Sequence, residues 1–286
     1  REMTNRIQKV VGGDFSELMV GNVHRFCSKF LFEQGRIPAD SAIIDDEEAV
    51  SIIADYRNED EEGVTRDFNR YKGYQTIIFF QHFIYQMEHQ HPWKYYLHPE
   101  SFTDDDREAV KHICASQKIE YDEQAVVNIY HHAQEYMDEA NAPGLDGKTA
   151  DRIRVLLWKM YYANCYARYK EENHLFDFED LLLYTYDIYR SDPTCKRYPW
   201  IQVDEVQDLN GMQLAIIDLL TAEDNSMVMY LGDEQQAIFS FMGAKVETLT
   251  LLKMRCKGNI HHLQRNHRSP KYLLDVFNDY AEKQLK

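Results

Sequence analysis

Residues 200–208, Trp-Ile-Gln-Val-Asp-Glu-Val-Gln-Asp, decide the fold that the sequence predicts. Their first four members form a short, mostly apolar run that is typical of a strand. A second run, Met-Val-Met-Tyr-Leu at 227–231, leads into Gly232 and Asp233, and helical spacing covers 212–220 between the two runs. The order strand, helix, strand predicts two parallel strands of an α/β layer.

Two adjacent carboxylates, Asp204 and Glu205, stand directly after the first predicted strand. Parallel sheets bind their ligands beyond the carboxyl ends of the strands, so a site is expected at these side chains. One carboxylate could hold Mg²⁺ through water while the other orients an attacking water. Carboxylates are costly to bury without such a use, and an acid pair in solvent is the plain alternative.

The spacing of apolar residues predicts mostly helix from about residue 45 to residue 190. A break is expected at 141–147, Asn-Ala-Pro-Gly-Leu-Asp-Gly, because Pro and two Gly residues interrupt the helical pattern there. We expect the next helix to run from about Thr149 or Asp151 to Glu172.

Length and composition limit the possible classes of protein. A chain of 286 residues can form two domains, or one domain with a large insertion. Apolar residues make up 44% of the chain and aromatic residues 13%, which excludes an intrinsically disordered chain. Five cysteines without a C-x-x-C pair favour reduced thiols and a cytoplasmic location. No apolar run approaches the roughly 20 residues of a spanning helix, so we expect no membrane partner.

The net charge is −16, yet the basic residues are concentrated in one segment. Residues 253–274 contain no Asp or Glu, and their cations are Lys253, Arg255, Lys257, Arg265, Arg268 and Lys271. A phosphate backbone meets the local charge rather than the total, so this segment is compatible with a nucleic-acid partner.

Three longer stretches follow one another: Val-Asp-Glu-Val-Gln-Asp-Leu-Asn-Gly-Met-Gln at 203–213, Leu-Gly-Asp-Glu-Gln-Gln-Ala-Ile-Phe-Ser-Phe-Met-Gly-Ala at 231–244 and Leu-Gln-Arg-Asn-His-Arg-Ser at 263–269. In this order they resemble the Walker B, third and fourth motifs of the UvrD/Rep-type superfamily 1A DNA helicases. Weaker resemblances to the same family lie at 21–27, Gly-Asn-Val-His-Arg-Phe-Cys, and at 177–182, Asp-Phe-Glu-Asp-Leu-Leu.

The resemblance implies an α/β fold: a P-loop NTPase with a RecA-like parallel sheet, here a partial 1A domain, and a large all-helical 1B insertion. Residues 1–44 and 173–255 would form the truncated 1A domain, 45–172 the helical 1B insertion, and 256–286 the start of domain 2A. The chain would then begin after motif Ia and end just after motif IV.

By the same resemblance, Glu205 would be the general base or water-orienting residue, Gln236 the sensor of the γ-phosphate and Arg268 an arginine finger. The residues implied to hold ATP and Mg²⁺ are Asp204, acting through water, with Gln207, Asp208 and His267. His267 stands where the family usually has a Tyr that stacks on adenine. For Arg268 taken alone, an ordinary surface arginine is the alternative.

The implied DNA contacts fall in two places. His24 and Arg25 would touch the DNA backbone, whereas Phe239 and Phe241 would stack on the bases of a single strand. Stacking suits a protein that must hold any sequence, because every base has a π-face. Core packing of Phe239 and a structural role of His24 are the alternatives.

Together these features imply an ATP-dependent, 3′-to-5′ DNA helicase or translocase that moves on single-stranded DNA and unwinds duplex DNA, in repair, replication or recombination. Two alternatives stay open: a non-hydrolysing DNA-binding or scaffold module of helicase fold, and the helicase part of a helicase-nuclease. No G-x-x-G-x-G-K-[ST] run occurs in the 286 residues. Because such a loop cradles the phosphates, we expect this chain alone to be inactive as an ATPase.

Overall fold

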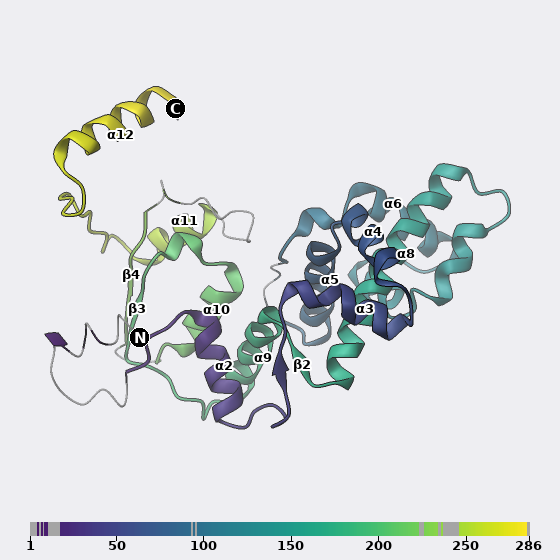
Figure 1. The fold of residues 1–286 in the computed structure, drawn as a ribbon, viewed down its shortest axis with the longest axis horizontal. Helices are drawn as coiled ribbons and strands as arrows, with labels where there is room; N and C mark the ends of the chain where they lie inside the picture. Colours follow the sequence, from purple (N-terminus) through teal and green to yellow (C-terminus); the bar gives the residue numbers. More distant parts are fainter. Residues whose placement is uncertain are drawn as a thin grey trace. The chain divides into compact units, whose positions relative to one another are not determined.

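The computed structural model describes residues 5, 7, 9–10, 18–92, 94, 96–222, 226–233, 236 and 246–284. Two compact units follow one another along the chain, Arg1–Lys245 and Val246–Lys286, and each is described by itself. The described residues form a helix-rich α/β fold whose two small parallel sheets both lie in the first unit (Figure 1). None of the described helices is long and apolar enough to cross a membrane.

The predicted strand, helix and strand are confirmed. β3 (Trp200–Val203) pairs in parallel with β4 (Met227–Tyr230), and α10 (Gly211–Leu220) connects them. The register sets Val203 opposite Tyr230, so the two strands end at the same edge of the sheet. Ligands of parallel sheets bind at this edge, which makes it the first place to look for a site.

One apolar core supports these strands. It is formed by α2 (Val23–Glu33), α9 (Phe178–Ser191) and α10, and Ile201 of β3 packs against it. Its completely buried side chains include Leu31, Leu181, Leu182, Leu183, Met212 and Ile216. The core therefore fixes the start of β3 relative to the helices that precede it.

A second and larger core is mostly helical and centres on α8 (Gly147–Glu172). Ile153, Leu156, Leu157 and Met160 of α8 are completely buried and share one face at helical spacing. The elements of this region are η1 (Asp46–Glu48), α3 (Ala49–Arg57), α4 (Glu61–Tyr71), α5 (Gly73–Glu88), η2 (Pro99–Ser101), α6 (Asp104–Gln117), α7 (Glu123–His131) and η3 (Glu135–Asn141). The prediction of a mostly helical middle region is confirmed.

Side-chain caps determine where two of the helices begin. Asp146 accepts hydrogen bonds from the backbone N–H groups of Lys148 and Thr149, so α8 starts at Gly147, the last residue of the predicted break and two residues before Thr149. Asn210 accepts from the Gln213 N–H at 2.9 Å, and Gln213 accepts in return from the Asn210 N–H at 3.0 Å. This capping box starts α10 one residue earlier than its apolar spacing predicted.

The two ends of the helical region lie side by side. β1 (Ala42–Ile43) leads into the region and β2 (Leu175–Phe176) leads out of it, and the two strands pair in parallel. The Ala42 N–H donates to the His174 carbonyl, and the Ile44 N–H donates to the Phe176 carbonyl, so backbone hydrogen bonds hold both ends of this pair of strands. The chain therefore enters and leaves the helical region at one place.

The second unit contains α11 (Val246–Arg255) and α12 (Lys271–Gln284). α12 carries four exposed apolar side chains at helical spacing: Tyr272, Val276, Phe277 and Tyr280. The basic segment that the sequence singled out, 253–274, runs from the last turn of α11 through the connection into the first turn of α12.

Candidate functional site

The carboxyl end of β3 carries Asp204 and Glu205, and both side chains are exposed. Glu205 has a left-handed backbone, with φ of 50° and ψ of 43°. A residue with a β-carbon is strained in this conformation, by the order of 1 to 3 kcal/mol, and the surrounding structure must hold it there. The backbone N–H of Val206 donates to the Leu231 carbonyl at 3.0 Å, which ties this turn to the end of β4.

Gln207 lies beneath the exposed carboxylate of Glu205 and is 2% exposed. Its Nε2 donates to Glu205 Oε2 at 2.7 Å, and its Oε1 accepts from the Asp233 N–H at 3.1 Å. Only one orientation of the amide satisfies both bonds, because a carboxylate needs a donor and an N–H needs an acceptor. The side chain therefore connects the ends of the two strands.

Gly232 leaves the space that this connection needs. A β-carbon at position 232 would lie 2.6 Å from Gln207 Oε1 and 2.7 Å from Val206 Cγ1. Neither contact is tolerable, and both neighbours are buried, so a side chain here would displace the Gln207 amide.

The turn after β4 continues the network to Gln236. The exposed Gln236 side chain donates from Nε2 to Asp233 Oδ2 at 2.8 Å, and its backbone N–H donates to the Asp233 carbonyl at 3.1 Å. The structure thus brings Glu205 and Gln236 into one hydrogen-bonded set, as two of the three predicted catalytic residues. The predicted stacking residues Phe239 and Phe241 lie outside the described residues.

The acidic residues at the carboxyl ends of β3 and β4 suit a metal ion that is bound partly by the protein and partly by a bound ligand. Among the described residues, no three His, Cys, Asp or Glu side chains are close enough to hold a metal ion by themselves. Mg²⁺ usually binds through one or two carboxylates, with phosphate oxygens and waters completing its shell. The exposed Asp204 fits that role. Asp208 has a buried Oδ1 that accepts no hydrogen bond within the described part of the chain.

His24 and Arg25 lie on the first turn of α2, where the Asn22 side chain accepts from the Arg25 N–H at 2.8 Å. The Arg25 side chain is exposed. His24 is half-buried and its ring packs edge-to-face on Phe178, with the centroids 5.6 Å apart. Burial lowers the pKa of His24 below 6.5, so at neutral pH it can offer a phosphate a neutral donor but not a cation.

Arg268 and His267 lie in the second unit, and both side chains are exposed. Asn266 Oδ1 accepts from the backbone N–H groups of Arg268 and Ser269 at 2.8 and 2.9 Å. This turn gives the Asn-His-Arg-Ser stretch a fixed local backbone just before α12.

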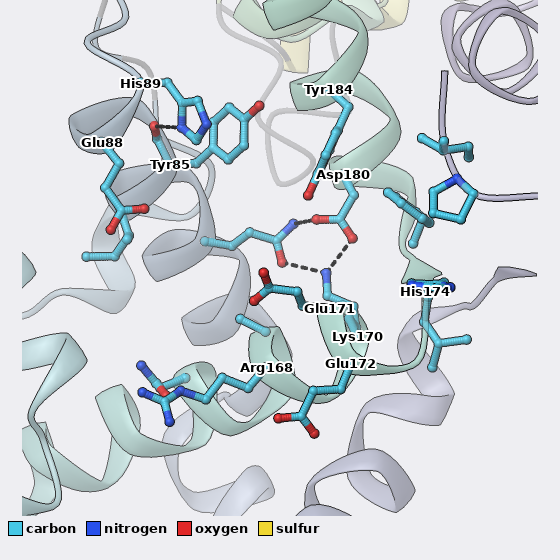
Figure 2. Close-up of a pocket in the computed structure, with 18 of the residues that line it drawn as sticks. Tyr85, Glu88, His89, Arg168, Lys170, Glu171, Glu172, His174, Asp180 and Tyr184 are labelled. Atoms are coloured by element: carbon cyan, nitrogen blue, oxygen red, sulfur yellow. Dashed lines mark hydrogen bonds and ion pairs between the residues drawn. The ribbon is translucent and has the colours of Figure 1, made fainter. Parts of the chain in front are cut away.

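A groove of about 1000 Å³ lies in the first unit between the helical region and α9. Figure 2 shows Tyr85 and His89 on one side, Tyr184 and Asp180 on another, and Arg168 and Glu172 toward its other end. The Tyr85 and His89 rings are stacked, with their centroids 3.8 Å apart. Sequence reasoning missed this groove, because its walls come from segments far apart in the chain.

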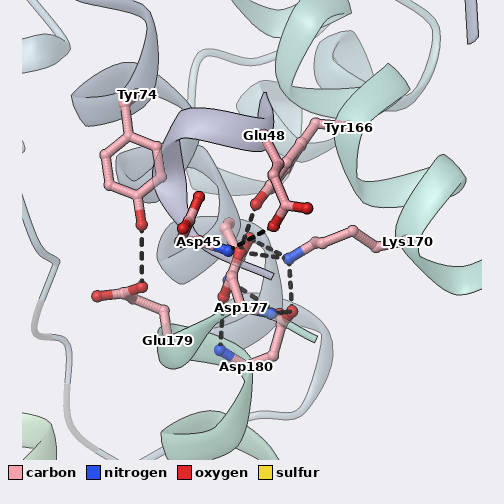
Figure 3. A network of polar contacts seen from close by, with 9 residues as sticks. Asp45, Glu48, Tyr74, Tyr166, Lys170, Asp177, Glu179 and Asp180 are labelled. Atoms are coloured by element: carbon pink, nitrogen blue, oxygen red, sulfur yellow. Dashed lines mark hydrogen bonds and ion pairs between the residues drawn. The ribbon is translucent and has the colours of Figure 1, made fainter. Parts of the chain in front are cut away.

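A buried polar network forms one wall of the groove (Figure 3). Lys170 Nζ donates to Asp177 Oδ2 and Asp180 Oδ2, each at 2.5 Å, and to Gln81 Oε1 at 2.9 Å. Tyr166 donates its hydroxyl to Asp177 Oδ2 at 3.1 Å. Asp177 and Asp180 also form the capping box that begins α9, so the Asp-Phe-Glu-Asp stretch has a structural use.

Burial and the charge of Asp177 raise the pKa of Asp180 to about 7, although the Lys170 ammonium opposes this change. Burial also disfavours ionised Asp177, but Lys170 outweighs that effect and lowers the pKa of Asp177. For Glu179, which accepts from the Tyr74 hydroxyl, burial and the Asp177 charge raise the pKa to about 8. Asp177 and Asp180 thus share one ammonium group, while Glu179 lies beside them and bonds the Tyr74 hydroxyl.

Most of the chain is similar to a known protein family. A family model described as the UvrD/REP helicase N-terminal domain matches residues 1–257. A "Probable DNA helicase II homolog" of Mycoplasma capricolum is 25% identical over 194 residues, which cover 63% of this chain and 26% of that protein.

Two further relatives match shorter segments. The "ATP-dependent DNA helicase srs2" of Schizosaccharomyces pombe is 32% identical over 124 residues, which cover 43% of this chain and 13% of that protein. The "ATP-dependent DNA helicase PcrA" of Staphylococcus aureus is 30% identical over 120 residues, which cover 40% of this chain and 16% of that protein. The matched part of the chain spans about a quarter or less of these relatives.

Proposed function

Because the chain belongs to the UvrD/REP helicase N-terminal domain family, we propose that it forms part of an ATP-dependent DNA helicase or translocase. The observation that carries this proposal is the hydrogen-bonded set at the ends of β3 and β4, where Gln207 joins the exposed Glu205 carboxylate to Asp233 and Asp233 bonds Gln236. The names of the relatives support ATP and DNA as the ligands.

We assign the hydrolytic step to the water held by Glu205. The water oxygen attacks the γ-phosphorus of ATP, its proton passes to the Glu205 carboxylate, and the bond from γ-phosphorus to the bridging oxygen breaks to leave ADP. Asp204 would hold Mg²⁺ through water, and this ion would neutralise charge on the phosphate oxygens. Gln236 would sense the γ-phosphate, and Arg268 would supply a cation from the second unit.

The nucleotide would also meet Asp208 and His267, of which only His267 offers an exposed ring for stacking. Single-stranded DNA would meet Arg25 and His24 at the start of α2, with Phe239 and Phe241 stacking on its bases. Movement would run 3′ to 5′ along one strand and unwind duplex DNA, in repair, replication or recombination.

We also propose the domain arrangement that goes with this function. Residues 1–44 and 173–255 would form a RecA-like 1A domain, 45–172 a helical 1B insertion, and 256–286 the start of domain 2A. The pairing of β1 with β2 supports an insertion, because it brings the two ends of the helical region together. Two separate apolar cores support it as well.

The test is ATP hydrolysis by the full-length protein, with and without single-stranded DNA. Glu205→Gln should reduce the DNA-stimulated rate by about 100- to 10,000-fold, which is the usual contribution of a general base. Glu172→Gln, at an exposed position on α8, is the matched control and should keep the wild-type rate. A wild-type protein that binds DNA without hydrolysing ATP would favour a scaffold module instead.

A further inference from the structure

We propose that Gln207 is a positioning residue: it holds the Glu205 carboxylate in place and makes that position depend on the turn after β4. This inference rests on the proposed role of Glu205 in hydrolysis. It assigns Gln207 an indirect role, through Glu205, in place of direct contact with the nucleotide.

The first support is the burial of the Gln207 amide. The side chain is 2% exposed, and both of its polar atoms already bond to protein, Nε2 to Glu205 and Oε1 to the Asp233 N–H. With 2% of its surface exposed, the amide offers a bound nucleotide almost no access to its second N–H or its second lone pair. The amide donates to Oε2 of Glu205. In the described part of the chain no donor reaches Oε1 of Glu205, so this oxygen stays available to a water.

The second support is the need for a tether at Glu205. An exposed Glu side chain has several rotatable bonds, so without a partner the carboxylate has no fixed position of its own. A hydrogen bond from a neutral amide to a carboxylate is stronger than one between neutral groups, and it fixes one oxygen without neutralising the charge. Gln207 thereby keeps a charged base in one orientation.

The third support is continuity with Gln236. From Glu205 the bonds run through Gln207 to the Asp233 N–H, and from Asp233 to both the backbone and the side chain of Gln236. Gly232 admits the amide between the two strand ends. A shift of the Gln236 turn therefore pulls on Gln207 and changes the position of Glu205. The base is held in its working place only when that turn is in the position described here.

The test measures single-turnover ATP hydrolysis and the KM for ATP in the full-length protein. Gln207→Met keeps the length of the side chain but removes both hydrogen bonds. The maximal rate should fall about 10- to 100-fold, as expected for losing a buried bond to a charged group, while KM changes less than about threefold. Gln117→Met removes another Gln–carboxylate bond, to Glu139 on the surface, and should leave both parameters unchanged.

Two further variants separate positioning from simple stability. Gly232→Ala leaves Gln207 and Glu205 chemically intact but pushes the amide away, so it should lower the maximal rate as Gln207→Met does. In a Glu205→Gln background, Gln207→Met should cause little further loss, because its effect passes through Glu205. This comparison stays informative if Gln207→Met alone lowers the melting temperature.

Failure of this inference can be distinguished from failure of the proposed function. If Glu205→Gln keeps full activity, the proposed function itself is wrong. If Glu205→Gln is inactive while Gln207→Met keeps the wild-type maximal rate, only the role of Gln207 is overturned. A raised KM at an unchanged maximal rate would overturn it as well, because Gln207 would then contact the nucleotide.

Discussion

Replacing Lys170 with Met should lower the free energy of unfolding of the first unit by about 3 to 5 kcal/mol. Lys170 is 4% exposed and its ammonium group is the shared partner of Asp177 and Asp180. Its removal leaves two carboxylates buried next to each other without a counter-ion, and such uncompensated charges are what make a broken buried pair expensive. The pKa of Asp180 is already raised to about 7, so this group can take up a proton and bring the loss toward the lower end of the range.

The measurement is thermal unfolding of the full-length protein at pH 8, followed by circular dichroism. For a unit of this size each kcal/mol shifts the melting temperature by about 2 to 4 °C, so the loss corresponds to roughly 6 to 20 °C. Lys148→Met is the matched control, because Lys148 is an exposed lysine on the same helix. It should change stability by less than about 0.5 kcal/mol. A Lys170→Met protein that melts within about 1 °C of wild type would refute the reasoning.

Three other outcomes are expected. The pKa of Glu179 is raised to about 8, so the folded protein holds more protons than the unfolded chain between about pH 5 and 8. The stability that this group contributes is therefore lost as the pH rises through that window. Glu179→Gln should flatten the fall in melting temperature from pH 6 to 9, and an unchanged slope would contradict the assignment. Leu157→Ala should lower the free energy of unfolding by about 2 to 5 kcal/mol in denaturant titrations, because Leu157 is completely buried on α8. A loss below about 1 kcal/mol would mean that the core is not packed as described. Arg25→Ala should weaken binding of single-stranded DNA and reduce the slope of log affinity against log salt by about 1, and an unaltered slope would remove Arg25 from the interface.

The sequence was sufficient to predict the strands and helix around the candidate site. The apolar runs before Asp204 and Gly232 predicted β3 and β4 to within one residue, because each run ends abruptly at polar or Gly residues. The long helix α8 was also predicted, with its end at Glu172, but it starts at Gly147 rather than at Thr149 or Asp151, because Asp146 caps it inside the Pro and Gly break.

The pairing of β1 with β2 could not be predicted from the sequence. Each strand has two residues, which is too short for a period, and the partners are more than 130 positions apart. The same limit applies to the Lys170 network. Gln81 lies on another helix, so no local pattern indicates that it meets Asp180.

The candidate site was predicted in its residues but not in its connections. Adjacent acids after a strand pointed to Asp204 and Glu205, and the resemblance added Gln207 and Gln236. The bridge from Glu205 through Gln207 to Asp233 depends on the register of two parallel strands and on the missing side chain at Gly232. Register is a property of the folded sheet, so this connection became visible only in the structure.

The proposed function depends on Glu205 orienting the water that attacks ATP. Its most direct test is the rate of a single turnover of bound ATP by the full-length Glu205→Gln protein, measured together with the dissociation constant for ATP. The rate should be about 100- to 10,000-fold lower at an unchanged dissociation constant, because the variant keeps its shape and loses only the base. A turnover rate equal to that of the wild-type protein would contradict this role of Glu205.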